Sequence, residues 1–402
     1  LIPLSGNTRS LHSSRARMAA SILSHVVSDL CIGKPAVRVL PPSTPIAAAL
    51  ATLRAGADPF VFVDAAPPDA KKTAVLSVVK VSVAEILCYV CGDGGNLSDP
   101  AAALGRPVSV LTAVVGDHGV TRRVDPQTSL LDAIDALLAN NSHSLVVPLH
   151  ARARKKHHHV SAGYCVLTQQ DIVRHLFGSI SLFSPVAALS VSSLGLVRRD
   201  DVHAVHVDDD ALDAIPLLRR SIGQGTAVAV VADDDALVGE ICPGVLGSCD
   251  DVESVSAAFA TLSAGDAMTY IDCYFSPPEF LLRSIRAELT GKGLHAMCDL
   301  MDAAYTTDVG ALSSSSTSSD EECLPLAPAR RARKMSSGSF RWRSTEDVAA
   351  CHAESSLVAV MAQALAHRVG HVWVVDELSG ALVGVVSCAD VLAVLRDHLR
   401  PE

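Results

Sequence analysis

A hydroxyl residue followed three positions later by a carboxylate occurs at three places where an apolar run changes into a helical pattern. The three pairs are Ser82 with Glu85, Thr168 with Asp171, and Ser387 with Asp390. This is the spacing of a capping box, in which both side chains satisfy backbone donors of the first helical turn and suit the helix dipole. The N-terminus of such a helix can also receive a phosphate group. A structural role and a ligand-binding role are therefore both open.

Each pair stands at the same place in a repeated pattern. The clearest copy has a helix at 356–365, a strand at 372–375, a Ser-Gly turn, a strand at 382–386 and a second helix from Ser387. Three worn copies precede it, with the same order of helix, strand and strand. Their segments are 46–53, 60–64 and 74–79; 128–138, 144–149 and 164–167; and 211–215, 227–231 and 237–241. Four copies of one small unit predict a repeat architecture.

This β-α-β-β-α pattern resembles the cystathionine-β-synthase (CBS) domain, whose units pair into Bateman modules. The resemblance covers roughly residues 26–400 apart from insertions, and its motifs are most specific in the fourth copy. The chain resembles most the plant proteins made only of CBS domains and, more distantly, the gamma regulatory subunit of AMP-activated kinase. We expect an α/β (α+β) fold of four CBS repeats in two Bateman modules, at 26–180 and 185–400.

The resemblance also implies a ligand site in the cleft between paired units. The acid of each hydroxyl–acid pair would bind the ribose of an adenosyl ligand such as AMP, ADP, ATP or S-adenosylmethionine. A basic residue at the start of a strand would contact phosphate. Counting five residues back from Asp376, and from Pro148, which aligns with it, places His371 and His143 at that position. Pro59 and Ala227 replace it in the other copies, and Val245 replaces the third acid. A neutral imidazole binds phosphate more weakly than a guanidinium, so both histidines are also open to a purely structural reading.

Composition excludes several other classes of function. The formal net charge is −10 and aromatic residues make up 4% of the chain, which argues against nucleic-acid binding. The eleven cysteines are scattered through apolar runs and predict reduced, mostly buried thiols, including the lone pair Cys88 and Cys91. We expect no membrane span, no metal site and no required cofactor. No activated nucleophile is signalled, so an enzyme is not expected.

Two segments lie outside the repeats. The first, 1–25, is expected to be disordered; its Arg- and Ser-rich character would fit a plastid or mitochondrial transit peptide, whereas a start at Met18 would leave the protein in the cytoplasm. The second is an insertion at 270–344, with helical patterns at 278–289 and 295–304 and a polar stretch at 313–344 that should be disordered. Basic residues before Ser336, Ser337 and Ser339 make these serines candidate phosphorylation sites.

These expectations combine into one functional hypothesis. The chain is a non-catalytic regulatory protein that binds an adenosyl ligand and modulates a protein partner, such as a kinase or a metabolic enzyme. The alternative is an adaptor, like a kinase regulatory subunit, whose ligand pockets are vestigial. Pairing of Bateman modules between two chains would give a homodimer.

Overall fold

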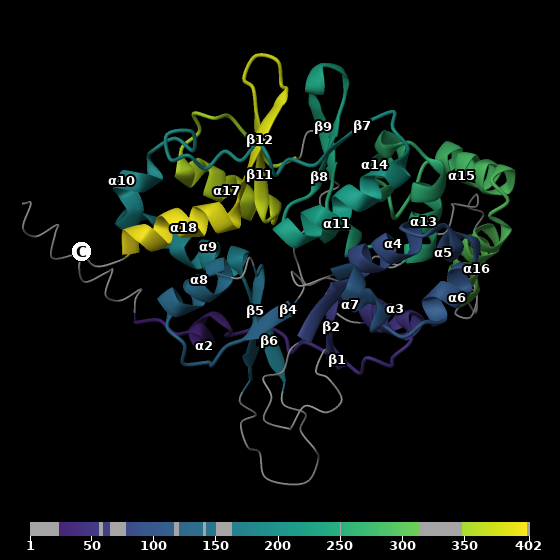
Figure 1. The fold of residues 1–402 in the computed structure, drawn as a ribbon, viewed down its shortest axis with the longest axis horizontal. Helices are drawn as coiled ribbons and strands as arrows, with labels where there is room; N and C mark the ends of the chain where they lie inside the picture. Colours follow the sequence, from purple (N-terminus) through teal and green to yellow (C-terminus); the bar gives the residue numbers. More distant parts are fainter. Residues whose placement is uncertain are drawn as a thin grey trace, which may run out of the picture.

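Four β-α-β-β-α units build the molecule (Figure 1). The computed structural model describes residues 24–55, 59–64, 78–115, 120–139, 142–149, 163–249, 251–312 and 348–399. Unit 1 consists of β1 (Val39–Leu40), α3 (Ile46–Ala55), β2 (Phe60–Asp64), β3 (Val78–Ser82) and α4 (Val83–Cys91). Unit 2 consists of β4 (Val120–Arg123), α8 (Leu130–Ala139), β5 (Ser144–Pro148), β6 (Tyr164–Thr168) and α9 (Gln169–Phe177).

The second half of the chain repeats this order. Unit 3 consists of β7 (Ala204–His206), α11 (Ala214–Gln224), β8 (Val228–Val231), β9 (Leu237–Ile241), α12 (Pro243–Leu246) and α13 (Val252–Thr261). Unit 4 consists of β10 (Ala350–Cys351), α17 (Leu357–His367), β11 (His371–Val375), β12 (Leu382–Ser387) and α18 (Cys388–Leu399). The predicted α/β repeat fold is confirmed.

The local boundaries differ from the prediction in units 1 and 3. Strand β3 runs to Ser82, beyond the predicted end at 79, and residues 74–77 of the predicted strand lie outside the described part of the chain. In unit 3 the second helix is split into the short α12 and the longer α13, which starts after the cap Asp251.

Strand pairing joins the units two by two. In each unit the first and second strands are parallel, and the second and third are antiparallel. Strands β3 and β4 pair antiparallel, which makes units 1 and 2 one six-stranded sheet. Units 3 and 4 keep separate three-stranded sheets, joined by a bridge between Ala236 and Ala381. Figure 1 shows the strands of units 1 and 2 on one side, those of units 3 and 4 on the other, and helices between them.

The two largest hydrophobic cores group the units differently. One core joins unit 1 to unit 3, with α4 against α11 and α13. The other joins unit 2 to unit 4, with α9 against α17 and α18. Burial of apolar surface is the main favourable term in folding, so each half of the chain is stabilised largely by contact with the other half.

The insertion adds two helices to the pair formed by units 1 and 3. These are α15 (Glu279–Gly291) and α16 (His295–Leu312), at the places where the sequence predicts helices. Leu281, Ile285 and Leu289 recur every four residues on α15 and are buried in the shared core. Short helices α5 (Gly94–Ser98) and α6 (Pro100–Gly105) contact α16 on the same side. Among the described residues, no helix is long and apolar enough to span a membrane.

The segment that precedes each unit packs against the other unit of its module. Helix α2 (Val27–Leu30) precedes unit 1, yet the Val27 amide donates to Thr128 O of unit 2 at 2.9 Å. The Val191 amide, ahead of unit 3, donates to Ser355 O of unit 4 at 3.0 Å. The amides of Val108 and Ala264 make the reciprocal contacts, with Thr44 O and Asp209 O at 2.7 and 2.8 Å. Each time the acceptor lies between the first strand and first helix of the other unit.

Candidate functional site

The three predicted hydroxyl–carboxylate pairs all form capping boxes. At the start of α9, the Thr168 amide and hydroxyl donate to Asp171 Oδ2 at 2.8 and 2.6 Å. At the start of α18, the Ser387 amide and hydroxyl donate to Asp390 Oδ2 at 3.0 and 2.6 Å. At the start of α4, the Ser82 amide donates to Glu85 Oε2 at 2.7 Å and its hydroxyl donates to the same oxygen. The structural role expected from the spacing is therefore present in every case.

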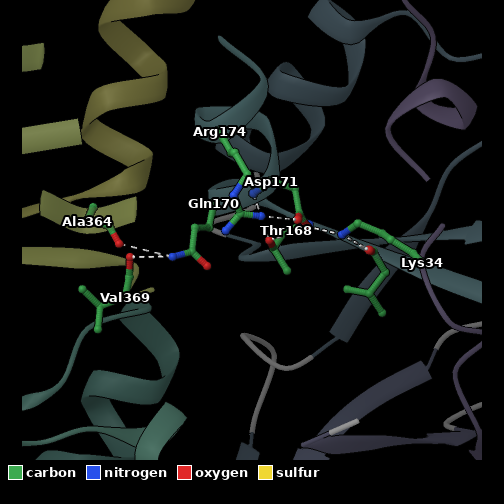
Figure 2. Close-up of polar contacts among 8 residues, drawn as sticks. Lys34, Thr168, Gln170, Asp171, Arg174, Ala364 and Val369 are labelled. Carbon is green, nitrogen blue, oxygen red and sulfur yellow. Dashed lines mark hydrogen bonds and ion pairs between the residues drawn. The ribbon is translucent and has the colours of Figure 1, made fainter. Parts of the chain in front are cut away.

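Asp171 has two further partners, both basic. Lys34, from the segment that precedes unit 1, forms an ion pair with Asp171 Oδ2, and its ammonium also donates to Val166 O at 2.9 Å. Arg174, one turn along α9, lies 3.5 Å from Asp171 Oδ1. Figure 2 shows Lys34 and Arg174 reaching the carboxylate from different elements. The Asp171 side chain keeps 16% of its surface exposed, so the carboxylate lies at the edge of the packed region.

Asp390 also has a basic partner from the segment that precedes the other unit of its module. Arg198, from the segment that precedes unit 3, places Nε 3.3 Å from Asp390 Oδ1. The same guanidinium lies 3.0 Å from Asp201 Oδ2. The Asp390 side chain is 14% exposed, close to the value for Asp171. Units 2 and 4 thus present matching carboxylates, each held by a capping hydroxyl and by a basic residue from a distant segment.

The pair in unit 1 has a different environment. Glu85 is 5% exposed and Ser82 is 9% exposed, because nearly the whole of α4 lies between α11, α13 and α7 (Val110–Val115). The carboxylate accepts from the Ser82 amide and hydroxyl inside this packing. A ligand could reach Glu85 only by opening the interface between units 1 and 3.

The structure corrects the predicted equivalence of the two histidines. In unit 4, His371 pairs with Ser387 across β11 and β12, whereas in unit 2 the residue opposite Thr168 is Ser144. His143 therefore stands one position earlier than His371 in its unit. A shift of one residue in a strand turns a side chain to the other face. The error arose from counting back from the turn, which has a different length in the two hairpins.

Both histidines bind groups of unit 3. His143 Nε2 donates to Gly223 O at the C-terminal end of α11, at 2.8 Å. His371 is buried, and its Nε2 donates to Glu240 Oε2 on β9 at 2.8 Å. The indole nitrogen of Trp373 donates to the same oxygen at 2.8 Å. Glu240 thereby links units 3 and 4. The proposed contact of His143 and His371 with a ligand phosphate stays a prediction.

Unit 3 lacks the hydroxyl–acid pair at its third strand, as the sequence indicates. Val245 lies within the short α12, and Ala227 is fully buried. An acid appears only further on, where Asp251 caps α13 and accepts from the Ser254 amide at 3.0 Å. This cap belongs to the packing between units 1 and 3, since Ser254 is fully buried.

The most important residues that the sequence analysis missed are Lys34, Arg198 and Glu240. Each acts on a partner more than 100 positions away or in a different unit, so no local pattern marks it. A weak signal does exist for the two basic residues. Gly33 and Gly195 have φ values of 81° and 66°, and each precedes its basic residue by one or three positions.

The remaining candidates fall outside any site. Cys88 and Cys91 are buried, and burial raises the pKa of the Cys91 thiol to about 12, which leaves it protonated and unreactive. In the described ranges, no group of His, Cys, Asp and Glu residues could hold a metal ion. The candidate phosphorylation sites Ser336, Ser337 and Ser339 lie outside the described residues, as do most of 1–25 and all of 313–344.

Comparison with known proteins agrees with this architecture. The model of the CBS domain matches residues 343–397, which cover unit 4 except the last two residues of α18. The CBS domain-containing protein CBSX5 of Arabidopsis thaliana is 37% identical over 96% of this chain and 100% of its own length. A second Arabidopsis thaliana protein, the SNF1-related protein kinase regulatory subunit gamma-like PV42b, is 21% identical over 86% of this chain and 82% of its own.

A solved structure supports the arrangement of all four units. It is a protein of Methanocaldococcus jannaschii described as a candidate archaeal homolog of g-AMPK, and it covers 92% of this chain and 100% of its own. The TM-score is 0.51 and the sequence identity is 14%, so the likeness concerns the fold. From the identity to the Arabidopsis protein over nearly its whole length, the chain belongs to the family of CBS domain-containing proteins.

Proposed function

We propose that this protein is a non-catalytic regulator that binds an adenosyl ligand at units 2 and 4 and modulates a protein partner. The observation that carries the proposal is the matched placement of Asp171 and Asp390. Both carboxylates stand at a helix N-terminus, are partly exposed and keep an oxygen edge toward a basic side chain. Glu85 has the same capping geometry but is enclosed in the core.

The chemistry of these positions suits a nucleoside. A carboxylate can accept hydrogen bonds from two neighbouring hydroxyls, as the 2′ and 3′ groups of a ribose present them. Arg174, beside the carboxylate of unit 2, favours an anionic ligand such as AMP, ADP or ATP, whereas Lys34 and Arg198 are already paired with the two carboxylates. His143 and His371 would have to leave Gly223 and Glu240 to contact a phosphate.

Regulation would act by a shift of population between two arrangements of the units. A ligand that binds one arrangement better favours it by the difference in its affinity for the two. The cores that join unit 1 to unit 3 and unit 2 to unit 4 would transmit such a change through the molecule. The kinase-regulatory name of one relative supports a kinase as the partner, with a metabolic enzyme as the second choice.

Calorimetry with AMP, ADP, ATP and S-adenosylmethionine tests the proposal. We expect Asp171→Ala and Asp390→Ala each to weaken binding at its own unit by tenfold or more. Asp132→Ala is a matched control, because Asp132 pairs with the Ser129 hydroxyl (2.6 Å) at the start of α8, a different helix of unit 2. Unchanged affinity in both site variants would contradict the assignment.

An adaptor with vestigial pockets is the second candidate. Its support is the burial of His371 against Glu240, which commits the predicted phosphate contact to packing. Absence of heat with all four ligands, together with a partner that binds wild type and Asp171→Ala equally, would favour the adaptor.

A further inference from the structure

The basic partners of Asp171 and Asp390 lie on two segments that cross between units. We call residues 31–38 strap 1 and residues 190–198 strap 2. Strap 1 leads into unit 1 and crosses unit 2, and strap 2 leads into unit 3 and crosses unit 4. We propose that Lys34 and Arg198 are internal counter-ions that an incoming ribose must displace, so that ligand binding at units 2 and 4 releases straps 1 and 2. This inference rests on the proposed function of the two carboxylates.

Strap 1 delivers Lys34 by a tight turn. The Lys34 amide donates to Cys31 O at 3.2 Å, and Gly33 within this turn has φ 81°, a conformation that favours glycine. Beyond Lys34, the Val37 amide donates to Tyr164 O of β6 at 2.7 Å. The Lys34 side chain is 25% exposed, and its two acceptors are Asp171 and Val166 of unit 2. The lysine therefore attaches strap 1 to the site itself.

Strap 1 has a further attachment, between two buried thiols. The thiol of Cys31 is hydrogen-bonded to that of Cys165 on β6, and this bond together with burial raises the pKa of Cys31. A protonated, buried thiol packs as a small apolar side chain. Of the three attachments, through Lys34, Val37 and Cys31, only the Lys34 ion pair competes directly with a ligand at Asp171.

Strap 2 crosses unit 4 through backbone bonds at Val385 of β12, whereas the backbone of strap 1 crosses β6 at Tyr164. The Arg198 amide donates to Val385 O at 3.0 Å, and the Val385 amide donates to Arg198 O at 2.9 Å. Val385 lies two residues before Ser387, as Val166 lies two residues before Thr168. Gly384 makes the crossing close, because a Cβ there would lie 2.8 Å from Arg198 O. The Lys34 ammonium and the Arg198 backbone thus contact the residue two positions before the capping hydroxyl in their respective units.

The carboxylate oxygens explain why ribose and strap compete. In unit 2, Asp171 Oδ2 accepts from the Thr168 amide, the Thr168 hydroxyl and Lys34, and Arg174 stands at Oδ1. In unit 4, Oδ2 of Asp390 is held by Ser387 while Arg198 holds Oδ1. A carboxylate offers about four lone-pair directions in total. Two ribose hydroxyls therefore need the directions that the straps now use.

Charge-neutral variants of the straps test the inference with AMP as the probe. Lys34→Met is placed in an Asp390→Ala chain, so that only unit 2 titrates, and Arg198→Met is placed in an Asp171→Ala chain. Because partly exposed ion pairs are weak, we expect AMP to bind about twofold to fivefold more tightly in each variant. Arg283→Met, on the exposed face of α15, removes one positive charge elsewhere and should leave affinity unchanged.

Hydrogen exchange of the wild-type chain gives a second readout. AMP should speed exchange of the amides of straps 1 and 2, and Gly384→Ala should speed exchange in strap 2 without AMP. Unchanged or weaker AMP affinity in the strap variants, with wild type binding normally, overturns the inference and leaves the proposed function standing. Absence of AMP binding in wild type and in every variant overturns both. AMP binding that appears only after Lys34→Met would support the inference strongly.

Discussion

The pair of units 1 and 3 and the pair of units 2 and 4 have the same elements but differ in how far they bury the carboxylate at the start of the second helix. In units 2 and 4 the start of the second helix is crossed by a strap, and Asp171 and Asp390 stay partly exposed. In unit 1 the corresponding Glu85 is enclosed, and helices α15 and α16 extend the core around it. A repeat can therefore become a ligand site or a structural joint according to what covers one strand–helix junction.

The largest effect should come from removing an anchor of the added helices. Ile285→Ala on α15 deletes a fully buried side chain from the core of units 1 and 3 and should lower the free energy of unfolding by about 2–5 kcal/mol. Chemical denaturation measures the change, with exposed Arg283→Ala as the control on the same helix. A loss below about 0.5 kcal/mol, the usual range for surface changes, would mean that α15 does not stabilise the core of units 1 and 3.

A smaller loss is expected at the polar link between units 3 and 4. Glu240→Ala leaves the His371 ring and the Trp373 indole without their buried acceptor and should cost about 1–3 kcal/mol. The exposed Glu377→Ala on the adjoining hairpin is the control for loss of one carboxylate. Equal denaturation midpoints for Glu240→Ala and Glu377→Ala would show that the link does not stabilise the contact between units 3 and 4.

The smallest effect should be a dependence on pH of the chain that leads into strap 1. His25 Nδ1 lies 3.1 Å from His175 Nε2, which connects the chain just before α2 to α9. Burial, and then the charge of His25, lowers the pKa of His175. As pH falls through about 6.5, the unfolded chain takes up this proton before the folded one, so the folded state loses stability.

Thermal unfolding at pH 7.5 and pH 5.5 checks this sign. The wild-type midpoint should fall more on acidification than that of His175→Gln, which has no imidazole to protonate. Strap 2 has no such pair among its described contacts, so hydrogen exchange at low pH should rise in strap 1 first. The same loss in wild type and His175→Gln would refute the role of His175.

The sequence predicts the repeated units and their caps because these depend on local patterns. Ser387 with Asp390 and the apolar spacing of α15 are readable within a few turns of chain. The registers of His143 and His371 could not be read, since strand pairing fixes them. Lys34 and Arg198 were missed for the same reason: their partners lie 137 and 192 positions away (171 − 34 and 390 − 198), and only the crossing of the straps brings them together.

The crossed segments also limit how this protein can be divided or built up. A unit expressed alone would lose its contact with the segment that precedes the other unit of its module. The other unit would lose its contact with the segment that precedes the removed unit. Duplication of a single repeat would leave one junction bare and one leader without a surface to bind. A repeat of this kind can therefore be gained or exchanged only together with the other unit of its module, as units 1 and 2 or units 3 and 4.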